Sequence, residues 1–482
     1  MAFIRKVKTA SGATAVQIAH KEHGRIIRIE HIGSAHTKEE LESLLLLARQ
    51  HLSGDQLSLF VDPVSPLKIS LKQSVSSVLL QILNEQYCLL GFDQLKDDIF
   101  AYLCITRIVE PTSKLDSLRV LAELGVTGIS KNRLYRCLGQ VITKGYRNTL
   151  TKQCFAKIAA KGISLILYDV TTLYFETQEE DEYRKSGMSK ERRLEPQILV
   201  GLLVDPSGFP LDLHSFEGNT AETNTILPVL EAFRKQHSLK DITVVADASM
   251  LSSKNLSALA KAGYTYIVGS RLHKIPYDIA EYQKTQELTD NQIITTQLNG
   301  NQRIIYQYRG KRAQLDMRNI EKQITKAEKI INGKLAVHKA KFLSIKTKDK
   351  KLNQKLIDKA KALVGVKGYV TNLAIPDEQV VVSYHQLWHV EQSFRMSKSD
   401  LKARPIFHQK RDAIEAHLTV VFAALAIGKM IENRTGMSIK RFVNTLRPIR
   451  SGTVIINGKE YLAEADIHSE VRSLLYKLES GH

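Results

Sequence analysis

Apolar residues in the middle of the chain come in short runs, separated by polar turns and by two segments with helical spacing. Short apolar runs bounded by turn signals are typical of buried strands, and spacings of three and four are typical of amphipathic helices. The pattern predicts strands at 163–168, 198–204 and 210–216, a helix at 223–237, a strand at 242–246, a helix at 252–262 and a strand at 264–269. Three hairpin-like strands followed by this alternation predict a mixed α/β sheet.

The residues before this sheet predict two further regions. Residues 13–18 and 25–33 alternate as a hairpin does, and Thr37 with Glu40 predicts a capping box that opens a helix. From 75 to 150 the pattern is helical, and Ser130 is expected to cap a helix. A helix, a turn with glycine and a helix rich in Arg and Tyr fit a helix-turn-helix, but also a helical bundle with a solvated basic face.

A lysine-rich segment interrupts the sheet pattern from residue 271. Residues 301–350 hold 14 basic and 4 acidic side chains, and short pieces at 303–308 and 342–346 fit strands. One apolar stripe predicts a helix here and consists of Met317, Ile320, Ile324, Ala327 and Ile331. The lysines fit either a solvated face or contacts with phosphate.

Regular structure resumes with a strand at 369–373 and a long helix at 384–402, which ends before Arg404-Pro405 because proline disfavours helical geometry in the preceding residue. A second strongly amphipathic helix is predicted at 412–433. The predicted organisation is a small α+β unit at 1–74, a helical DNA-binding region at 75–160, the first part of an α/β core at 161–270, a basic insertion at 271–380, the second part of the core at 381–435 and a C-terminal segment at 436–482.

The charge adds an expectation about partners. Lys and Arg number 69 against 50 Asp and Glu, and the net charge of +19 over 482 residues favours a polyanion such as nucleic acid. The four cysteines form no Cys-x-x-Cys pair, so we expect scattered thiols and no structural zinc. The N-terminus lacks a secretory apolar run, and the apolar residues 418–427 are too few to span a bilayer. We expect a soluble intracellular protein.

Two aspartates follow predicted central strands. Asp169 comes after Ile-Leu-Tyr, and Asp247 comes after Val-Val-Ala. Both are expected at the carboxyl ends of strands, where open α/β sheets place their sites. A single aspartate there is more often a helix cap or a turn residue. Two in one sheet of a basic protein favour a role in chemistry.

The helix predicted at 384–402 adds a third carboxylate. At about 100° per residue, one arc of about 80° carries aromatic residues, a glutamate and cations, namely Tyr384, Trp388, Glu391, Arg395, Lys398 and Lys402. The alternative is a surface helix on which Glu391 pairs with Arg395. That alternative explains the charges, but it does not explain why two aromatic residues share their arc.

Three carboxylates on a sheet and a nearby helix suit a site with two magnesium ions. Mg²⁺ prefers oxygen ligands, and two ions about 3.5–4 Å apart activate a nucleophile and stabilise the leaving oxygen of a phosphodiester. The neighbouring lysines and arginines suit DNA phosphates.

These residues resemble a known family. The chain is similar to the DDE transposases of bacterial insertion sequences, in the superfamily called "IS four", whose signature is Tyr-x2-Arg-x3-Glu-x6-Lys. Tyr384, Glu391 and Lys398 match this spacing, and Leu387 stands where the signature has arginine. Arg395, one turn after Glu391, is the candidate to supply that charge.

Further stretches carry the same resemblance, which covers residues 160–430 in the family's order. They are the sequence from Leu387 through Arg404-Pro405-Ile406, Tyr-Asp-Val-Thr-Thr around Asp169, Glu-Gly-Asn-Thr at 217–220 and Val-Ala-Asp-Ala around Asp247. The resemblance implies an RNase H-like mixed-sheet core with an insertion domain between the second aspartate and the glutamate.

The resemblance also implies the site and its ligands. It makes Asp169, Asp247 and Glu391 the catalytic, metal-binding triad for two Mg²⁺ ions, for which Mn²⁺ substitutes. It implies DNA contacts for Tyr384 and Lys398, and the cations of the same stretch are expected to join them, namely Arg395, Lys402 and Arg404.

The implied activity is cut-and-paste DNA transposition. A homodimer would bind paired terminal inverted repeats and then target DNA, in the bacterial cytoplasm at the nucleoid. Some relatives pass through a DNA hairpin and hold a flipped base on an aromatic residue. Trp388, the one tryptophan, does not map onto that residue, and we expect it to pack in the core.

Two other functions stay open. One is a transposase-derived protein that binds DNA without cleaving it, and the other is a host nuclease of RNase H fold. The three intact carboxylates argue against the first. The lysine-rich insertion and the Tyr-Glu-Lys helix argue against the second.

Overall fold

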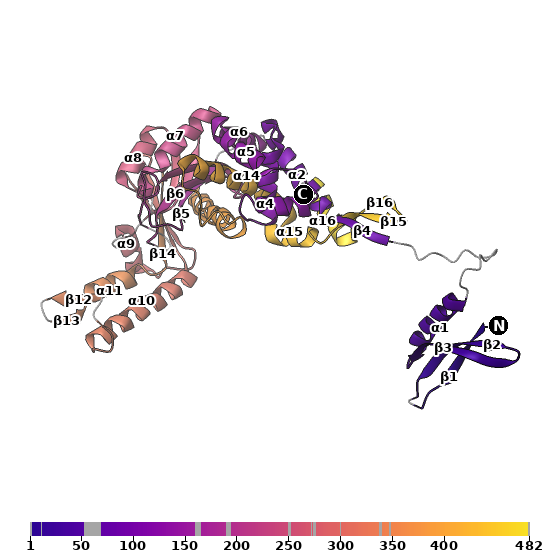
Figure 1. Ribbon diagram of the computed structural model, residues 1–482. Coiled ribbons are helices and arrows are strands. Elements are labelled where there is room, and N and C mark those ends of the chain that lie inside the picture. Colours follow the sequence, from indigo (N-terminus) through magenta and orange to yellow (C-terminus); the bar gives the residue numbers. More distant parts are fainter. Residues whose placement is uncertain are drawn as a thin grey trace. The chain divides into compact units, whose positions relative to one another are not determined.

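The chain folds into two compact units, Met1–Ser70 with Ile455–Glu460, and Leu71–Val454 with Tyr461–His482 (Figure 1). The structure is a computed structural model. It describes residues 2–10, 12–52, 69–159, 165–188, 194–248, 252–270, 272, 276–298, 300–336, 340–346 and 349–480.

The first unit is a three-stranded antiparallel sheet with one helix. Its elements are β1 (Ala2–Lys8), β2 (Thr14–Glu22), β3 (Arg25–Ala35) and α1 (Lys38–Leu52). The expected hairpin is β2 with β3, and β1 is an additional strand that pairs with β2. The capping box is confirmed, because the Glu40 amide donates to Thr37 Oγ1 and the Thr37 amide donates to Glu40 Oε2, each at 3.2 Å. Val16, Ile18 and Ala48 form the core of this unit.

The second unit is built on one mixed sheet of eight strands, in the order β10-β11-β14-β9-β8-β5-β6-β7 (Figure 1). β5 pairs in parallel with β8, and β8 with β9, whereas the other neighbours pair antiparallel. The strands are β5 (Leu165–Tyr174), β6 (Gln197–Val204), β7 (Pro210–Glu217), β8 (Thr243–Ala246), β9 (Thr265–Ser270), β10 (Ile293–Gln297), β11 (Arg303–Tyr308) and β14 (Val366–Thr371). The predicted order of strands and helices over 165–270 is confirmed.

Helices cover both faces of this sheet. Side chains along β5 alternate between the two faces, so each residue of β5 can be assigned to one of them. Tyr168 points to the face of α7 (Ile226–His237), where its hydroxyl donates to Thr225 at 2.9 Å. α8 (Ser253–Lys261) packs against α7. Thr171 and Leu173 point to the opposite face, toward α13 (Trp388–Arg395) and α14 (Arg411–Thr435). Asp169 has the same parity as Thr171 and so belongs to this second face.

α14 is the central helix of the core. Every residue from Ala416 to Ile431 is buried, so the helix is enclosed on all sides, and the prediction of an amphipathic helix was wrong here. It is also the one helix among the described residues that is long and apolar enough to cross a membrane. Burial inside the protein explains its composition, because a helix enclosed by other elements has no solvated face.

A set of helices precedes the sheet in the chain. It comprises α2 (Ser77–Leu89), α3 (Asp98–Val109), α4 (Ser117–Glu123), α5 (Lys131–Thr143) and α6 (Tyr146–Ala159), with the 3₁₀ turn Phe92–Leu95. Of this set, α2, α3, α5 and α6 pack against α14. Ser130 caps α5 as predicted, by accepting from the Arg133 amide. α5 buries Leu134, Cys137 and Val141, and it packs against α3 and α14. The remaining short elements are β4 (Ile69–Val75), α15 (Ile439–Leu446), β15 (Ser451–Ile456), β16 (Lys459–Ala463) and α16 (Ser469–Ser480).

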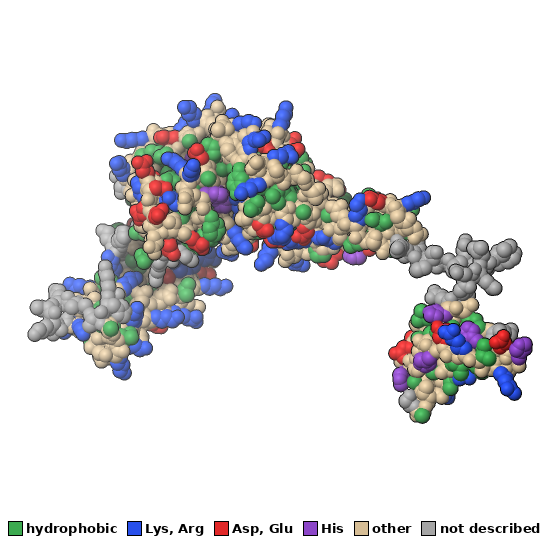
Figure 2. Space-filling model, viewed as in Figure 1, with side chains coloured by type: hydrophobic (Ala, Val, Ile, Leu, Met, Phe, Trp, Pro, Cys, Tyr) green, Lys and Arg blue, Asp and Glu red, His purple; other side chains and the backbone are tan. Residues whose placement is uncertain are grey.

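The lysine-rich segment adds strands to the main sheet as well as helices of its own. β10, β11 and β14 continue the sheet beyond β9, and β11 coincides with the predicted strand. The remaining elements are α9 (Tyr277–Thr285), α10 (Gly310–Ile331), β12 (Leu343–Lys346), β13 (Asp349–Leu352) and α11 (Gln354–Ala362). α10 buries Ile320 and Ala327 of the predicted apolar stripe, and it also buries Ile330, which the stripe did not include. Figure 2 shows Lys and Arg side chains along the visible surface of this segment.

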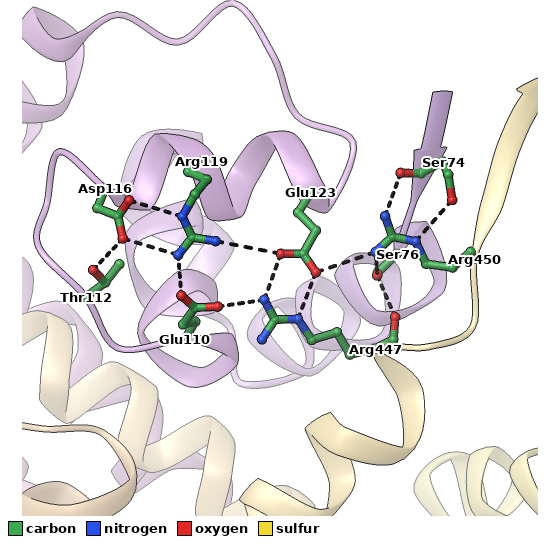
Figure 3. Close-up of polar contacts among 9 residues, drawn as sticks. All are labelled: Ser74, Ser76, Glu110, Thr112, Asp116, Arg119, Glu123, Arg447 and Arg450. Carbon is green, nitrogen blue, oxygen red and sulfur yellow. Dashed lines mark hydrogen bonds and ion pairs between the residues drawn. The ribbon is translucent and has the colours of Figure 1, made fainter. Parts of the chain in front are cut away.

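An ion-pair network ties the C-terminal segment to the helices around α4 (Figure 3). Arg447 donates to Glu123 Oε1 at 2.8 Å and Oε2 at 2.7 Å, and to Glu110 Oε2 at 2.6 Å. Arg119 also pairs with Glu110. Arg450 reaches Glu123 Oε1 at 3.5 Å. Arg447, which follows α15, therefore pairs both with Glu110 at the end of α3 and with Glu123 of α4.

We expect Arg447→Ala to destabilise the protein by about 1–2 kcal/mol, because it removes the hydrogen bonds from one guanidinium to two carboxylates. Arg447→Lys should recover only part of this, since an ammonium cannot reproduce the two-pronged contact with Glu123. Urea unfolding of both variants measures the difference. Arg119→Ala is the matched control, and its more exposed side chain should make it the milder change. An Arg447→Lys variant as stable as wild type would contradict this role.

Candidate active site

Two carboxylates lie next to each other on neighbouring strands. β5 and β8 pair in parallel with Tyr168 opposite Ala246, so Asp169 and Asp247 are the next residues on the two chains. Asp247 directly follows β8, as predicted, and it is exposed. Asp169 is half-buried inside β5, so its predicted place at a strand end was wrong. β5 continues because β6 pairs with it as far as Tyr174, beyond the last residue that β8 covers.

The helix predicted at 384–402 is broken in two places. α12 (Asp377–His385) ends at a turn, α13 follows, and Met396–Asp400 form a π-helical turn. At the break, the amides of Leu387 and Val390 bond to carbonyls three residues back, which tightens the backbone. Tyr384 and Glu391 therefore lie on different helices. The prediction that the residues from Tyr384 to Lys402 share one arc of a single regular helix was therefore wrong.

Tyr384 reaches the second aspartate. Its hydroxyl donates to Asp247 Oδ1 at 3.1 Å, and its ring lies 4.8 Å from the ring of Tyr369 on β14. Burial raises the pKa of Tyr384, and the negative charges of Asp247 and Asp169 raise it further. Tyr384 therefore stays a neutral donor at ordinary pH and fixes the orientation of the Asp247 carboxylate.

Gly269 of β9 makes room for this contact. A Cβ built there would stand 2.5 Å from the Tyr384 hydroxyl and 3.2 Å from the Ala248 Cβ. Any residue other than glycine would push the tyrosine away from Asp247. The sequence marks this position only as one glycine in a strand, so its role was not predicted.

We expect Gly269→Ala to cost about 1–3 kcal/mol of stability, as overpacked sites do. Much of this should vanish in a Tyr384→Phe background, because the atom that clashes is gone. A double-mutant cycle by urea unfolding should give a coupling of at least about 0.5 kcal/mol. Additive effects of the two substitutions would show that Gly269 does not hold Tyr384 in place.

The third carboxylate, Glu391, lies on α13, which packs against β5 and β6. Ser393 anchors this helix by donating to the Gly208 carbonyl at 2.7 Å. Phe394 meets Thr171 and Leu173, which share a face of β5 with Asp169. Glu391 itself is exposed. The helix therefore brings the third carboxylate to the face of the sheet that carries Asp169.

Lys367 of β14 is a component of this site that the sequence reading missed. Its ammonium lies 4.4 Å from the centre of the Tyr384 ring and 5.6 Å from that of Tyr369. Burial and the nearby Arg312 lower the pKa of Lys367, whereas Asp247 and Glu391 act to raise it. Lys367 is thus within electrostatic reach of two of the three carboxylates. A lysine inside the strand sequence Val-Lys-Gly-Tyr-Val was the available signal.

The family model described as transposase DDE domain matches residues 160–427. The chain belongs to this family of DDE transposases. The match includes all three carboxylates and both parts of the sheet around them. No curated protein sequence matches the chain.

Two solved structures resemble this DDE transposase. One is the piggyBac transposase synaptic complex with hairpin DNA, with a TM-score of 0.41, 12% identity and coverage of 73% of this chain and 70% of that one. The other is the Mos1 transposase paired-end complex with left transposon end, with a TM-score of 0.17, 11% identity and coverage of 47% and 66%. Both TM-scores lie below 0.5.

The carboxylates of the transposase site are suitable ligands for Mg²⁺, but in this structure they do not form a closely grouped metal site. Three carboxylates offer the oxygen ligands that Mg²⁺ prefers. In the described part of the chain, no three Asp, Glu, His or Cys side chains are grouped closely enough to hold one metal ion.

The cations predicted to contact DNA differ in their exposure. Arg395 is exposed on α13, and no ion pair with Glu391 occurs among the described side chains, so the alternative of an i,i+4 pair is not supported. Lys398 is half-buried and lines a small cavity with Thr171 and Phe394. Lys402 is exposed, with a positive φ of 43°.

Two further positions of this stretch differ in their surroundings. The Arg404 guanidinium lies 5.5 Å from the centre of the Tyr174 ring, and burial lowers the pKa of Arg404. Leu387, which replaces the arginine of the signature, is only 8% exposed. The buried position of Leu387 offers little room for a solvated charge.

Trp388 was wrongly expected in the core. Its side chain is 50% exposed at the start of α13, and its ring lies 4.1 Å from that of His389. The break after α12 turns this position outward.

Proposed function

We propose that this DDE transposase cleaves and joins DNA strands at the ends of an insertion sequence by two-metal phosphodiester chemistry. Asp169, Asp247 and Glu391 are its catalytic carboxylates. The observation that carries the proposal is the register of β5 with β8, which makes Asp169 and Asp247 neighbours. The packing of α13 on the same face of β5 supports Glu391 as the third member.

We propose further that the core is RNase H-like. The order β7-β6-β5-β8-β9, with three antiparallel strands followed by two parallel ones, supports this assignment. Residues 271–380 would be the insertion between the second aspartate and the glutamate. The spacing of Tyr384, Glu391 and Lys398 supports membership in the "IS four" branch, with Leu387 as its departure from the signature.

Asp169, Asp247 and Glu391 would hold two Mg²⁺ ions, with Mn²⁺ as a substitute, and such ions would activate a nucleophile and stabilise the leaving oxygen. Around them, the Tyr384 hydroxyl holds one oxygen of Asp247. Lys367 offsets part of the negative charge of Asp247 and Glu391. These two side chains would keep the carboxylates in place before substrate binds.

The substrate of this proposal is double-stranded DNA, first the terminal inverted repeats and then the target. The net charge of +19 supports a polyanionic partner. Tyr384, Arg395, Lys398, Lys402 and Arg404 are the proposed contacts near the carboxylates. We further propose a homodimer in the synaptic complex and a cytoplasmic, nucleoid-associated location.

α10 offers a second proposed surface for DNA. Its exposed Arg318, Lys322, Lys326 and Lys329 line a hollow of about 480 Å³. The first three are four residues apart and share one side of the helix. A row of cations at this spacing suits a phosphate backbone.

We expect that changing Lys322, Lys326, Lys329 and Lys341 together to Gln will flatten the dependence of log affinity on log salt. The slope should fall by about 0.9 for each phosphate that the variant no longer contacts. Lys339, another lysine of the segment 301–350, lies outside the described residues. A matched control changes four exposed lysines at or beside α7 and α8, namely Lys235, Lys240, Lys254 and Lys261. If both quadruple variants shift the slope equally, α10 has no special role.

The test of the proposed function is incubation of the full chain with the element's end DNA and Mg²⁺, scored for strand breaks at the element boundary. Breaks at that boundary, followed by joining to a target plasmid, are the expected result. Binding of the ends without any break would point to a DNA-binding protein derived from a transposase. Cleavage without preference for the ends would point to a nuclease.

A further inference from the structure

Four basic side chains gather in the interior, away from the three carboxylates of the proposed site. Arg107 of α3, Lys114 in the loop after it and His417 of α14 are 7%, 8% and 5% exposed. His408 is half-buried, and its ring lies 5.6 Å from that of His417. A buried lysine or arginine is rare unless it is paired with an acidic group.

The contacts within this cluster fix the state of His417. Its Nε2 lies 3.1 Å from the Ala403 carbonyl, which can only accept, so Nε2 carries a proton. Its Nδ1 lies 3.3 Å from Lys114 Nζ and 3.5 Å from Arg107 Nη2, and a charged guanidinium can only donate. Nδ1 therefore accepts, and His417 is neutral. Burial, followed by the charges of Lys114 and Arg107, lowers the pKa of His417 well below its ordinary value, in agreement.

No acidic group among the described residues compensates these charges. Burial, followed by the charge of Arg107, lowers the pKa of Lys114 well below its ordinary value, and burial is also the main influence on Arg107 and His417. The one titratable acid that acts on Arg107 and Lys114 in the described part of the chain is the Cys104 thiol. Burial raises the pKa of Cys104 well above its ordinary value, so the thiol stays neutral. Arg107 remains charged, because its pKa falls only to about 10. The guanidinium has five N–H donors, and a single bond, to His417, is seen for them in the described structure.

An uncompensated cation in the interior is costly, and a negative charge that joins it offsets part of that cost. We propose that Arg107 and Lys114, oriented by His417, bind a small oxyanion of the phosphate class. The forked donors of arginine match the oxygens of such an ion, and the lysine adds a point charge. None of these residues belongs to the proposed catalytic set.

The shared chemistry of the ligand is a phosphate group, which could come from free inorganic phosphate or from a DNA strand. The low exposure of Arg107 and Lys114 favours the free ion, because a DNA backbone cannot enter a site this closed. The bound ion would then join α3, the loop that carries Lys114 and α14, and through Ala403 the segment that follows Glu391.

The test uses the full chain without DNA and with inorganic phosphate as the probe. The thermal midpoint should rise with phosphate concentration, and at about 100 times the dissociation constant the apparent unfolding constant should fall about 100-fold. Chloride at equal ionic strength should give a much smaller shift. Equal shifts with chloride and phosphate would overturn the oxyanion site.

Lys114→Met and Arg107→Met should abolish the phosphate response. In phosphate-free buffer, Arg107→Met should also melt higher than wild type, because a buried, charged guanidinium without an acidic partner is removed. The matched control is Lys152→Met at an exposed position, which should keep the full response. A phosphate response that survives in Lys114→Met would refute the proposal. Should both variants fail to fold, phosphorus NMR of phosphate with wild type decides, and absence of line broadening refutes it.

A second arm separates the two sources of phosphate. Wild type and Lys114→Met are titrated with duplex DNA at several salt concentrations. Equal salt slopes are expected if the ligand is the free ion. A slope lower by about 0.9 in Lys114→Met would assign the site to a DNA phosphate and overturn the free ion as its ligand.

Discussion

Replacing Asp247 with Asn is expected to abolish strand cleavage by the DDE transposase while DNA binding persists. The same holds for Asp169→Asn and Glu391→Gln, because each change removes a ligand charge and keeps the shape of the side chain. Loss of several kcal/mol of charge stabilisation corresponds to a fall in cleavage rate on the order of 1,000-fold or more. Cleavage of labelled end DNA and a binding titration on the same preparations measure the two effects.

Two controls make this test specific. Tyr384→Phe keeps the Asp247 carboxylate and removes only its hydrogen bond, so its defect should be much smaller than that of Asp247→Asn. Glu378→Gln changes an acidic side chain in the first turn of α12 and should leave cleavage unchanged. Cleavage by Asp247→Asn at the wild-type rate would exclude the carboxylate assignment.

Replacing Glu415 with Ala is expected to cost about 3 kcal/mol of stability, as breaking a buried ion pair does. This carboxylate of α14 receives Arg147 of α6 at 2.7 Å, the Tyr183 hydroxyl at 2.6 Å and the Ser215 hydroxyl of β7. It is 18% exposed, and Arg147 is 20% exposed. Removing it leaves a largely buried guanidinium without its counter-charge, which is the costly way to break such a pair. Urea unfolding of the full chain measures the loss.

The Glu415 contribution should also depend on pH. Burial raises the pKa of Glu415, but Arg147 and the hydrogen bonds from Ser215, Tyr183 and Arg147 outweigh it, and the net pKa lies below the ordinary value of 4.5. A carboxyl with a lowered pKa in the folded state stabilises the protein above its unfolded pKa and loses this contribution as the pH falls through the folded pKa. The difference between wild type and Glu415→Ala should therefore be constant near neutrality and shrink below about pH 4.5.

The matched control is Glu281→Ala, which breaks the exposed pair of Glu281 with Lys284. It should cost less than about 1 kcal/mol, as exposed pairs do. A Glu415→Ala variant no less stable than this control would show that the buried network contributes nothing net.

Local sequence signals predicted the elements that depend on near neighbours. The capping box of Thr37 with Glu40 and the cap at Ser130 both form as expected, since a cap needs only residues three positions away. The order of strands and helices along the chain from β5 to β9 was predicted from the lengths of the apolar runs and from the turn signals between them. The stripe predicted on α10 contributes two of the three buried positions of this helix, since helical periodicity is set by the backbone.

The sequence did not reveal pairings between distant segments. Nothing local indicates that β10, β11 and β14 extend the main sheet, since the partners of a strand lie elsewhere in the chain. The sequence around the break between α12 and α13 contains no proline or glycine, so no residue type there predicted it. The amphipathic prediction for α14 failed because enclosure on all sides is set by neighbouring helices and by the sheet.

By itself, the sequence determined which residue types are available for the chemistry: two aspartates after β-type runs, a glutamate with Tyr and Lys at fixed spacing, and a large excess of cations. The tertiary structure decided which of them meet. The parallel register of β5 and β8 makes Asp169 and Asp247 neighbours, and Gly269 leaves the space in which Tyr384 reaches Asp247. Lys367 joins them from a strand far along the chain. Such contacts depend on strand register and packing between segments that are distant in sequence, which spacing along one chain does not encode.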